Sequence, residues 1–414
     1  MTVFNSLGSN YTLSDALLAL RELVWPNQKS KIELKKILET AYQGETVLLF
    51  SGRDAIEYCL KAYGIGKNQT VLSQAFSCSS IEEAVNRTGA KVEYFDLSSN
   101  AVRTSLSAIE RAYTRSSNPK VVILQHGLGY VDEVAKIKEF CLSKKLILIE
   151  DLAQAVGAID DREKAVGSYA DAVILSFGRD KILDAISGGA VIFNSNSKFP
   201  YSLPDLLDWF ELKHDWKNKN QVLKLLLYPA LTIFVRSTYN LGMGKIFHRL
   251  AKKTNLMQSS IVSSHQSYQS FPAYFAPLVI KRWESINSQL DHRRKIAFYY
   301  YQQLKDSQYF KPLIKKDSIS QATNLRFPLL LSSQEQLLSL IEFLKGERIY
   351  LGDRWYKAPV DSGSLAFKSN YKAGSCPNAE KLSKQLLNLP THQKIEMSQA
   401  KRIIEVIKSW ERQQ

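Results

Sequence analysis

Two short apolar runs in this sequence end in side chains that can do chemistry. Residues 146–149 lead directly into Glu150 and Asp151, and residues 172–175 lead into Ser176, which Lys181 follows. Each run has the length and composition of a buried parallel strand, and ligands of open α/β sheets bind at the carboxyl ends of such strands. We therefore expect a carboxylate, a hydroxyl and an amine to meet at one edge of a sheet.

These three residue types match what pyridoxal phosphate (PLP) requires of a protein. Lys181 can form a Schiff base, and Asp151 can keep the pyridinium nitrogen protonated so that the ring withdraws electrons from the substrate carbon. Ser176 can hold the phosphate. Each residue taken alone is more commonly an ordinary solvated strand end, so the hypothesis depends on the combination.

The order and spacing of these residues resemble the DegT/DnrJ/EryC1/StrS family of fold-type-I aminotransferases. The family's E-D-x-A-Q strand end is found at residues 150–154, and its S-F-x-x-x-K motif is found at residues 176–181. Further matching segments span nearly the whole chain outside a middle region: 51–55, 89–96, 167–172 and 388–392. The resemblance implies the α/β fold of PLP-dependent transferases, with a mostly parallel sheet covered by helices and a smaller C-terminal α+β domain.

The 414 residues, 45% of them hydrophobic, are enough for about two domains. The resemblance places a large PLP-binding domain at 1–279, including a basic, partly apolar insertion at about 197–260. It places a linking helix and the small domain at 280–414. The alternation of strand and helix patterns between residues 46 and 193 predicts the same largely parallel sheet, and residues 280–304 are predicted to form one long helix.

The resemblance also implies further contacts to PLP. Gln154 would hydrogen-bond the phenolic oxygen, while Gly52 and Arg53, at the start of a predicted helix, would bind the phosphate. Arg53 stands where the family has Thr, and its guanidinium is expected to take over part of the phosphate binding. Cys78 aligns with the aromatic residue that stacks on the ring, and Phe76 is the alternative stacking residue.

The function implied by the resemblance is transfer of an amino group from a donor such as glutamate to a keto sugar, and the keto sugar is expected to be nucleotide-linked. Lys181 would then act as the base that moves a proton between the substrate carbon and the cofactor carbon in a 1,3-proton shift. Family sites are built across a two-fold axis, which predicts a homodimer, and Gln269 is the nearest candidate for the Asn that reaches the partner's phosphate. Two alternatives remain open: a PLP lyase or desulfurase using Cys376, and a non-catalytic, cofactor-binding or membrane-associated scaffold.

The net charge of +15 is concentrated in one segment. Residues 213–253 hold nine Lys or Arg and one acid, Asp215, and they include a mostly apolar run at 225–235 that is too short to span a bilayer. We predict a helical hairpin that packs on the large domain, with a weak contact to anionic membranes as the alternative. No nucleic-acid-binding motif accompanies the charge.

Neither the N-terminus nor the cysteines point to secretion or to a metal. Residues 1–20 lack the pattern of a signal peptide, and the four cysteines are scattered, without the spacing of zinc ligands. We therefore expect a cytoplasmic protein without a metal site.

Overall fold

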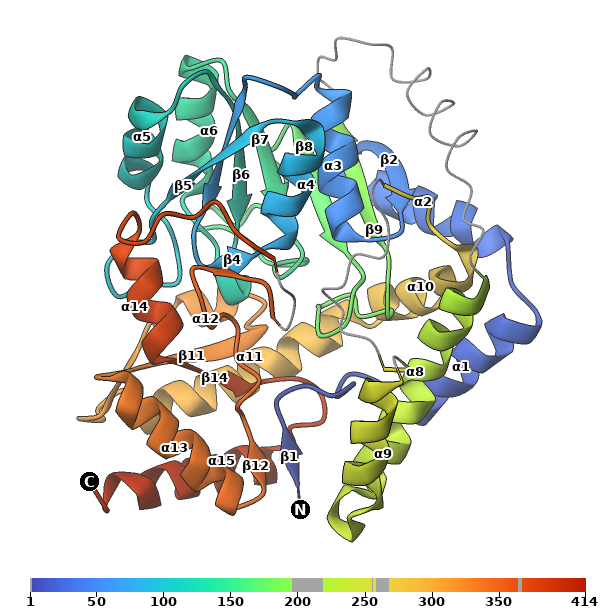
Figure 1. The fold of residues 1–414 in the computed structure, drawn as a ribbon, viewed down its shortest axis with the longest axis vertical. Helices are drawn as coiled ribbons and strands as arrows, with labels where there is room; N and C mark the ends of the chain where they lie inside the picture. The colour runs from blue at the N-terminus through green and yellow to red at the C-terminus, as the bar shows by residue number, and fades with distance from the viewer. Residues whose placement is uncertain (1, 196–218, 255, 258–267, 364–366) are drawn as a thin grey trace.

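A seven-stranded sheet forms the centre of the protein (Figure 1). The computed structural model describes all residues except 1, 196–218, 255, 258–267 and 364–366. Strand β9 runs antiparallel to both of its neighbours, and the other neighbouring pairs are parallel, which confirms the predicted fold class. In spatial order the strands are β2 (Gly44–Leu49), β9 (Gly189–Asn194), β8 (Ala172–Ser176), β7 (Ile147–Asp151), β6 (Pro119–Gln125), β3 (Thr70–Gln74) and β5 (Lys91–Phe95).

Helices cover both faces of this sheet. Helices α3 (Gly52–Ala62) and α4 (Ser80–Thr88) cover one face, and α5 (Leu106–Arg115) and α6 (Val134–Ser143) cover the other (Figure 1). Successive strand residues alternate between the faces, so Ile123 and Ile149 contact the first pair of helices. The same alternation directs Gln125 and Asp151, two residues further on, to that face.

The C-terminal part is a separate α+β layer. Its sheet is antiparallel, in the order β10 (Phe310–Pro312), β11 (Arg326–Leu331) and β14 (Leu386–Pro390). Helices α11 (Ile286–Leu304), α13 (Gln334–Gly346) and α15 (Met397–Glu411) share its core, and α12 (Ser318–Gln321) and α14 (Pro377–Gln385) complete it. The division at residue 280 remains a prediction.

Two short strand pairs join segments that are far apart in the sequence. Strand β1 (Val3–Phe4) pairs in parallel with β12 (Ile349–Tyr350), so the first residues of the chain lie against the C-terminal layer (Figure 1). Strand β4 (Ser77–Cys78) pairs in parallel with β13 (Val360–Asp361). The second pair holds the C-terminal layer against the segment that contains Cys78.

The prediction of one long helix at 280–304 is wrong. The structure has two helices, α10 (Ala276–Glu284) and α11, which are separated at Ser285. The Ser285 hydroxyl donates a hydrogen bond to the carbonyl oxygen of Lys281 at 2.9 Å, and its backbone departs from helical angles (φ −94°, ψ 7°). Serine favours such helix ends because its hydroxyl competes for backbone groups.

The predicted hairpin is confirmed for residues 219–253. Helix α8 (Lys219–Ser237) packs along α1 (Leu13–Val24), and η2 (Tyr239–Leu241) leads from it into α9 (Met243–Lys253). Val222, Leu226 and Val235 of α8 are buried in the same core as the sheet. The rest of the predicted insertion, at 197–218, 255 and 258–260, lies outside the described residues.

Helix α2 (Lys29–Tyr42) packs beside β2 and β9 at the sheet edge.

Among the helices that the structure describes, none is both long and apolar enough to cross a bilayer.

Candidate active site

Asp151 is the last residue of β7, and its carboxylate is held on both oxygens. The parallel register places Gln125 opposite it, and the Gln125 amide Nε2 donates to Asp151 Oδ2 at 2.8 Å. The backbone N–H of Ala153 donates to Asp151 Oδ1 at 3.0 Å. The side chain is only 5% exposed. The carboxylate is thus fixed in one orientation at the carboxyl edge of the sheet.

Lys181 follows β8 and is half-buried close to this carboxylate. Its Nζ lies 4.5 Å from the centroid of the Trp355 ring. Desolvation by burial lowers the pKa of Lys181, while Asp151, Cys78 and Asp180 act in the opposite direction. More of this amine is therefore neutral near pH 7 than in a solvated lysine, and a neutral amine is what a nucleophile or base requires.

The N-terminus of α3 meets the end of β8 at a close contact between Gly52 and Ser176. The Ser51 hydroxyl caps the helix by accepting from the backbone N–H of Asp54 at 3.2 Å. A Cβ atom on Gly52 would lie 3.0 Å from Cβ and 3.2 Å from Oγ of Ser176. The close approach of this helix end to Ser176 thus requires a glycine at residue 52. The N–H groups of the first helical turn, together with the Ser176 hydroxyl, can donate hydrogen bonds to a phosphate.

These side chains fit the predicted cofactor. The Gly52–Ser176 contact offers donors for a phosphate, and the neighbouring strand ends offer a carboxylate at Asp151 and a poorly solvated amine at Lys181. A phosphate ester, a ring nitrogen that is protonated and an aldehyde are the groups that such a set can bind.

Arg53 has a partner within the protein. Its Nε lies 3.0 Å from Oε2 of Glu83, and the residue is 8% exposed. The ion pair compensates the guanidinium charge and links α3 to α4. A direct contact of this guanidinium with phosphate remains a prediction, while the Gly52 end of the helix needs no side chain to bind an anion.

Gln154 and Phe76 both contact Tyr356. Gln154 Oε1 accepts from the backbone N–H of Leu128 at 2.8 Å, and its Nε2 donates to the Tyr356 hydroxyl at 2.6 Å. The Phe76 ring is 1% exposed and meets the Tyr356 ring edge-on at 5.3 Å. Both polar atoms of the Gln154 amide thus have partners within the protein. The contact of Gln154 with the phenolic oxygen of PLP stays a prediction, and stacking of Phe76 on the PLP ring does too.

Cys78, the residue that aligns with the family's stacking aromatic, interacts electrostatically with Lys181. It is half-buried in β4, and its thiol is close enough to influence the pKa values of Lys181 and Tyr356. Asp151 and Cys78 thus both lie within electrostatic range of Lys181, while stacking of Cys78 on a cofactor ring stays a prediction.

Trp355 and Tyr356 are the site residues that the sequence motifs did not identify. Their rings are stacked, with centroids 6.0 Å apart and planes 10° apart. The Trp355 backbone N–H donates to Asn388 Oδ1 at 2.6 Å, which anchors this segment to β14. Both residues come from the C-terminal layer, and no spacing in the sequence relates them to Lys181.

Glu150, the other acid of the strand end, faces away from Asp151. Its Oε2 lies 3.1 Å from Nε2 of His126, whose Nδ1 lies 3.4 Å from Asp132 Oδ2. Burial alone would lower the pKa of His126, but the hydrogen bonds to Asp132 and Glu150 raise it to about 9. This buried trio serves the core, which leaves Asp151 as the acid for the site.

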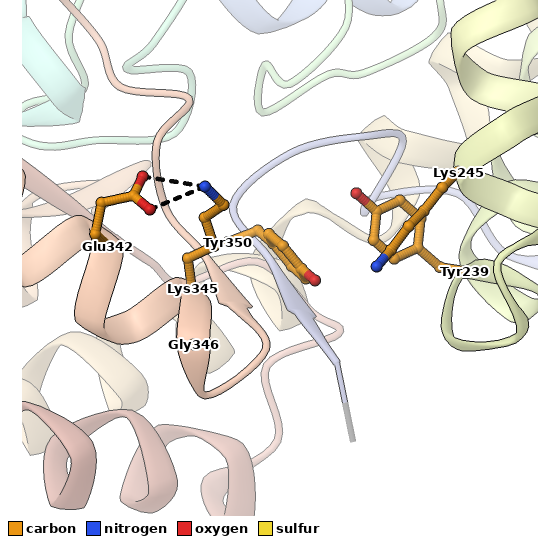
Figure 2. A pocket seen from close by; sticks show the side chains of 6 residues that line it. All are labelled: Tyr239, Lys245, Glu342, Lys345, Gly346 and Tyr350. Carbon is orange, nitrogen blue, oxygen red and sulfur yellow. Dashed lines mark hydrogen bonds and ion pairs between the residues drawn. The ribbon is translucent and has the colours of Figure 1, made fainter.

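A hollow of about 440 Å³ lies elsewhere in the molecule (Figure 2). Lys345 on its wall is held by Glu342 at 2.9 Å, and none of its lining residues belongs to the site around Lys181. The candidate site around Lys181 is therefore separate from this hollow. The hollow is lined by Tyr239, Lys245, Glu342, Lys345, Gly346 and Tyr350.

Comparison with known proteins matches residues 34–199 and 272–408 to the DegT/DnrJ/EryC1/StrS aminotransferase family. The chain belongs to this family. The match confirms the resemblance, and it leaves out residues 200–271, which overlap most of the predicted insertion. Family membership agrees with the prediction of an aminotransferase.

Two curated relatives show the range of similarity. A dTDP-4-dehydro-2,3,6-trideoxy-D-glucose 4-aminotransferase from Saccharopolyspora spinosa is 32% identical over 35% of this chain and 37% of its own length. A UDP-4-amino-4,6-dideoxy-N-acetyl-beta-L-altrosamine transaminase from Campylobacter jejuni is 24% identical over 92% of this chain and 90% of its own length. The chain spans less than half the length of the first curated relatives that it matches.

A solved structure shows that the fold is shared over the whole chain. The protein Spr1654 from Streptococcus pneumoniae, in its PLP form, superposes with a TM-score of 0.73 at 18% identity and covers 100% of this chain and 99% of its own. This likeness confirms the fold of PLP-dependent transferases.

Proposed function

We propose that this protein is a PLP-dependent aminotransferase that transfers an amino group from an amino acid donor such as glutamate to a nucleotide-linked keto sugar. The observation that carries the proposal is the proximity of Lys181, whose pKa is lowered by burial, to the fixed carboxylate of Asp151. Two curated relatives are named as transaminases of dTDP- and UDP-linked sugars, and this supports the substrate class. The pathway would be amino-sugar biosynthesis.

When bound, PLP supplies an electron-deficient ring that stabilises negative charge on the substrate carbon. Ser176 and the first N–H groups of α3 at Gly52 would hold its phosphate. Asp151 would hold a proton on the ring nitrogen, and Gln125 would keep the carboxylate aimed at that nitrogen through the 2.8 Å hydrogen bond. These residues orient the group without taking part in proton transfer at the substrate.

Lys181 would move the proton at its Nζ. Desolvation lowers the pKa of Lys181, which favours the neutral amine that can accept a proton and then return it to another atom. The Trp355 ring beside Nζ excludes water from that side of the amine. The structure thus supports one residue as both the attachment point and the base.

The environment of Cys376 argues against the desulfurase alternative. Cys376 is fully buried at the start of α14, and burial raises the pKa of its thiol to about 12. A desulfurase requires a mobile, ionisable cysteine. We therefore favour transamination over this chemistry.

Our proposal includes a homodimer whose two sites lie at a shared interface. The side-chain oxygen of Gln269 is buried without a hydrogen-bond partner among the described residues, which suits a residue that completes a contact elsewhere. Whether it replaces the family's cross-subunit Asn remains part of this proposal.

The half-reaction with the amino donor tests the proposed activity. Purified holoenzyme mixed with glutamate should lose the visible absorbance of bound PLP, gain that of the pyridoxamine form and release 2-oxoglutarate. Adding nucleotide-linked 4-keto or 3-keto sugars should restore the first spectrum. An unchanged spectrum with glutamate and with the other common amino acids would rule out transamination.

Replacing Gly52 tests the phosphate-binding role of the Gly52–Ser176 contact. Gly52→Ala adds a Cβ only 3.0 Å from Ser176 Cβ, and we expect PLP affinity to fall about tenfold because overpacking costs about 1–3 kcal/mol. Titration of the apoprotein with PLP measures the change. Gly346→Ala is the matched control, because nothing lies within 4 Å of its added Cβ. Equal affinities in the two variants would contradict the assignment.

A further inference from the structure

Helix α9 has apolar residues that pack against the protein and further apolar residues that are exposed to solvent. Phe247 and Ala251 face α8, and the Phe247 ring meets Phe234 of α8 edge-on at 5.3 Å. Met243, Ile246 and Leu250, spaced by three and four residues, form an adjacent stripe that is 53%, 64% and 54% exposed. Part of the apolar arc therefore remains in water.

Cations flank this exposed stripe. Lys245, Arg249, Lys252 and Lys253 are all exposed, and none of them forms an ion pair with a residue that the structure describes. Across α8, η2 and α9, residues 219–253 contain seven Lys or Arg and no Asp or Glu. A helix with an exposed apolar stripe beside uncompensated cations has the composition of an interfacial helix.

The positive charge of this surface favours an anionic bilayer over a second copy of the chain as its partner. A two-fold contact between copies of the chain would place α9 against the same surface, so that cations would face cations at close range. An anionic bilayer instead offers hydrocarbon for the stripe and phosphate for the cations. Figure 1 shows α9 at the outer edge of the molecule, where a flat surface can reach it.

We propose that α9 docks this protein on anionic membrane surfaces. Met243, Ile246 and Leu250 enter the interface, and Lys245, Arg249, Lys252 and Lys253 bind lipid headgroups. The sequence predicted packing on the large domain, with a weak membrane contact as the alternative, and the structure divides the two roles: α8 packs along α1, and α9 presents an exposed apolar stripe. The inference does not depend on the proposed chemistry.

Co-sedimentation of the holoprotein with vesicles tests the proposal. Binding to vesicles with about one third phosphatidylserine should exceed binding to pure phosphatidylcholine at least tenfold and should fall steeply as salt is raised. Changing Lys245, Arg249, Lys252 and Lys253 to Gln should reduce binding to the anionic vesicles at least tenfold. As a matched control, four exposed lysines of the C-terminal layer changed to Gln should bind like the wild type: Lys372, Lys381, Lys384 and Lys401.

A second variant separates the apolar contribution from charge. Changing Met243, Ile246 and Leu250 to Ser should weaken vesicle binding about tenfold while leaving net charge, thermal unfolding and the glutamate half-reaction unchanged. Equal binding to neutral and anionic vesicles, or no effect of either α9 variant, would overturn the proposal. So would a lower oligomeric mass of the Ser variant with unchanged vesicle binding, since the stripe would then be a subunit contact.

Discussion

Lys181→Ala is expected to abolish covalent attachment of PLP and to lower transamination at least 1,000-fold, an order of magnitude typical of losing a residue that is both nucleophile and base. The amine is half-buried beside Trp355 with a lowered pKa, and no second lysine shares that position among the described residues. Borohydride reduction followed by mass spectrometry should add the cofactor's mass to the wild-type chain and not to the variant. Absorbance in the visible range should change in parallel.

The control for this variant is Lys357→Ala, which removes an exposed lysine from the segment next to Tyr356. It should keep the reduced adduct and wild-type turnover. If Lys181→Ala still carried the adduct, or if it still turned over at a rate near that of the wild type, another residue would be the attachment point.

Asp151→Asn should lower kcat at least 100-fold while changing PLP affinity only a few-fold. The substitution removes the negative charge that would hold a proton on the ring nitrogen, but it preserves the side-chain shape beside Gln125 and Ala153. The Gly52–Ser176 contact is untouched, so the phosphate would remain bound. Steady-state kinetics and cofactor titration measure the two quantities separately.

Asp161→Asn serves as the control, because Asp161 is an exposed acid on the loop beyond the site. It should match the wild type in both measurements. Near-wild-type kcat in Asp151→Asn would exclude the proposed role of the carboxylate, and a loss of PLP affinity equal to the loss of kcat would mean that Asp151 mainly retains the cofactor.

The strands that carry the site were predictable because local sequence determines them. Apolar runs of four residues followed by polar side chains identified the ends of β7 and β8, and the parallel register then places Asp151 beside β6. The break at Ser285 was not predicted, since apolar periodicity continues through it, and the contact of its hydroxyl with the Lys281 carbonyl oxygen is evident only in the structure.

The side-chain partners within the site were less predictable than the residues themselves. The contacts of Arg53 and Gln154 with the cofactor stay predictions. The structure adds partners that the sequence did not indicate: Glu83 for the first and Tyr356 for the second. Tyr356 and Trp355 reach the site only because the C-terminal layer folds back over the sheet. Contacts between such distant segments depend on tertiary packing and leave no periodic signal in one sequence.

The pairing of β1 with β12 has a consequence for synthesis. Val3 leaves the ribosome well before its partner Ile349, which follows only after nearly 350 further residues. At about 5–20 residues per second, this strand waits on the order of 20 to 70 seconds for its hydrogen-bond partners. The large sheet can assemble during that interval, and closure of the N-terminal strand is then among the last steps of folding, completed once the C-terminal layer has emerged.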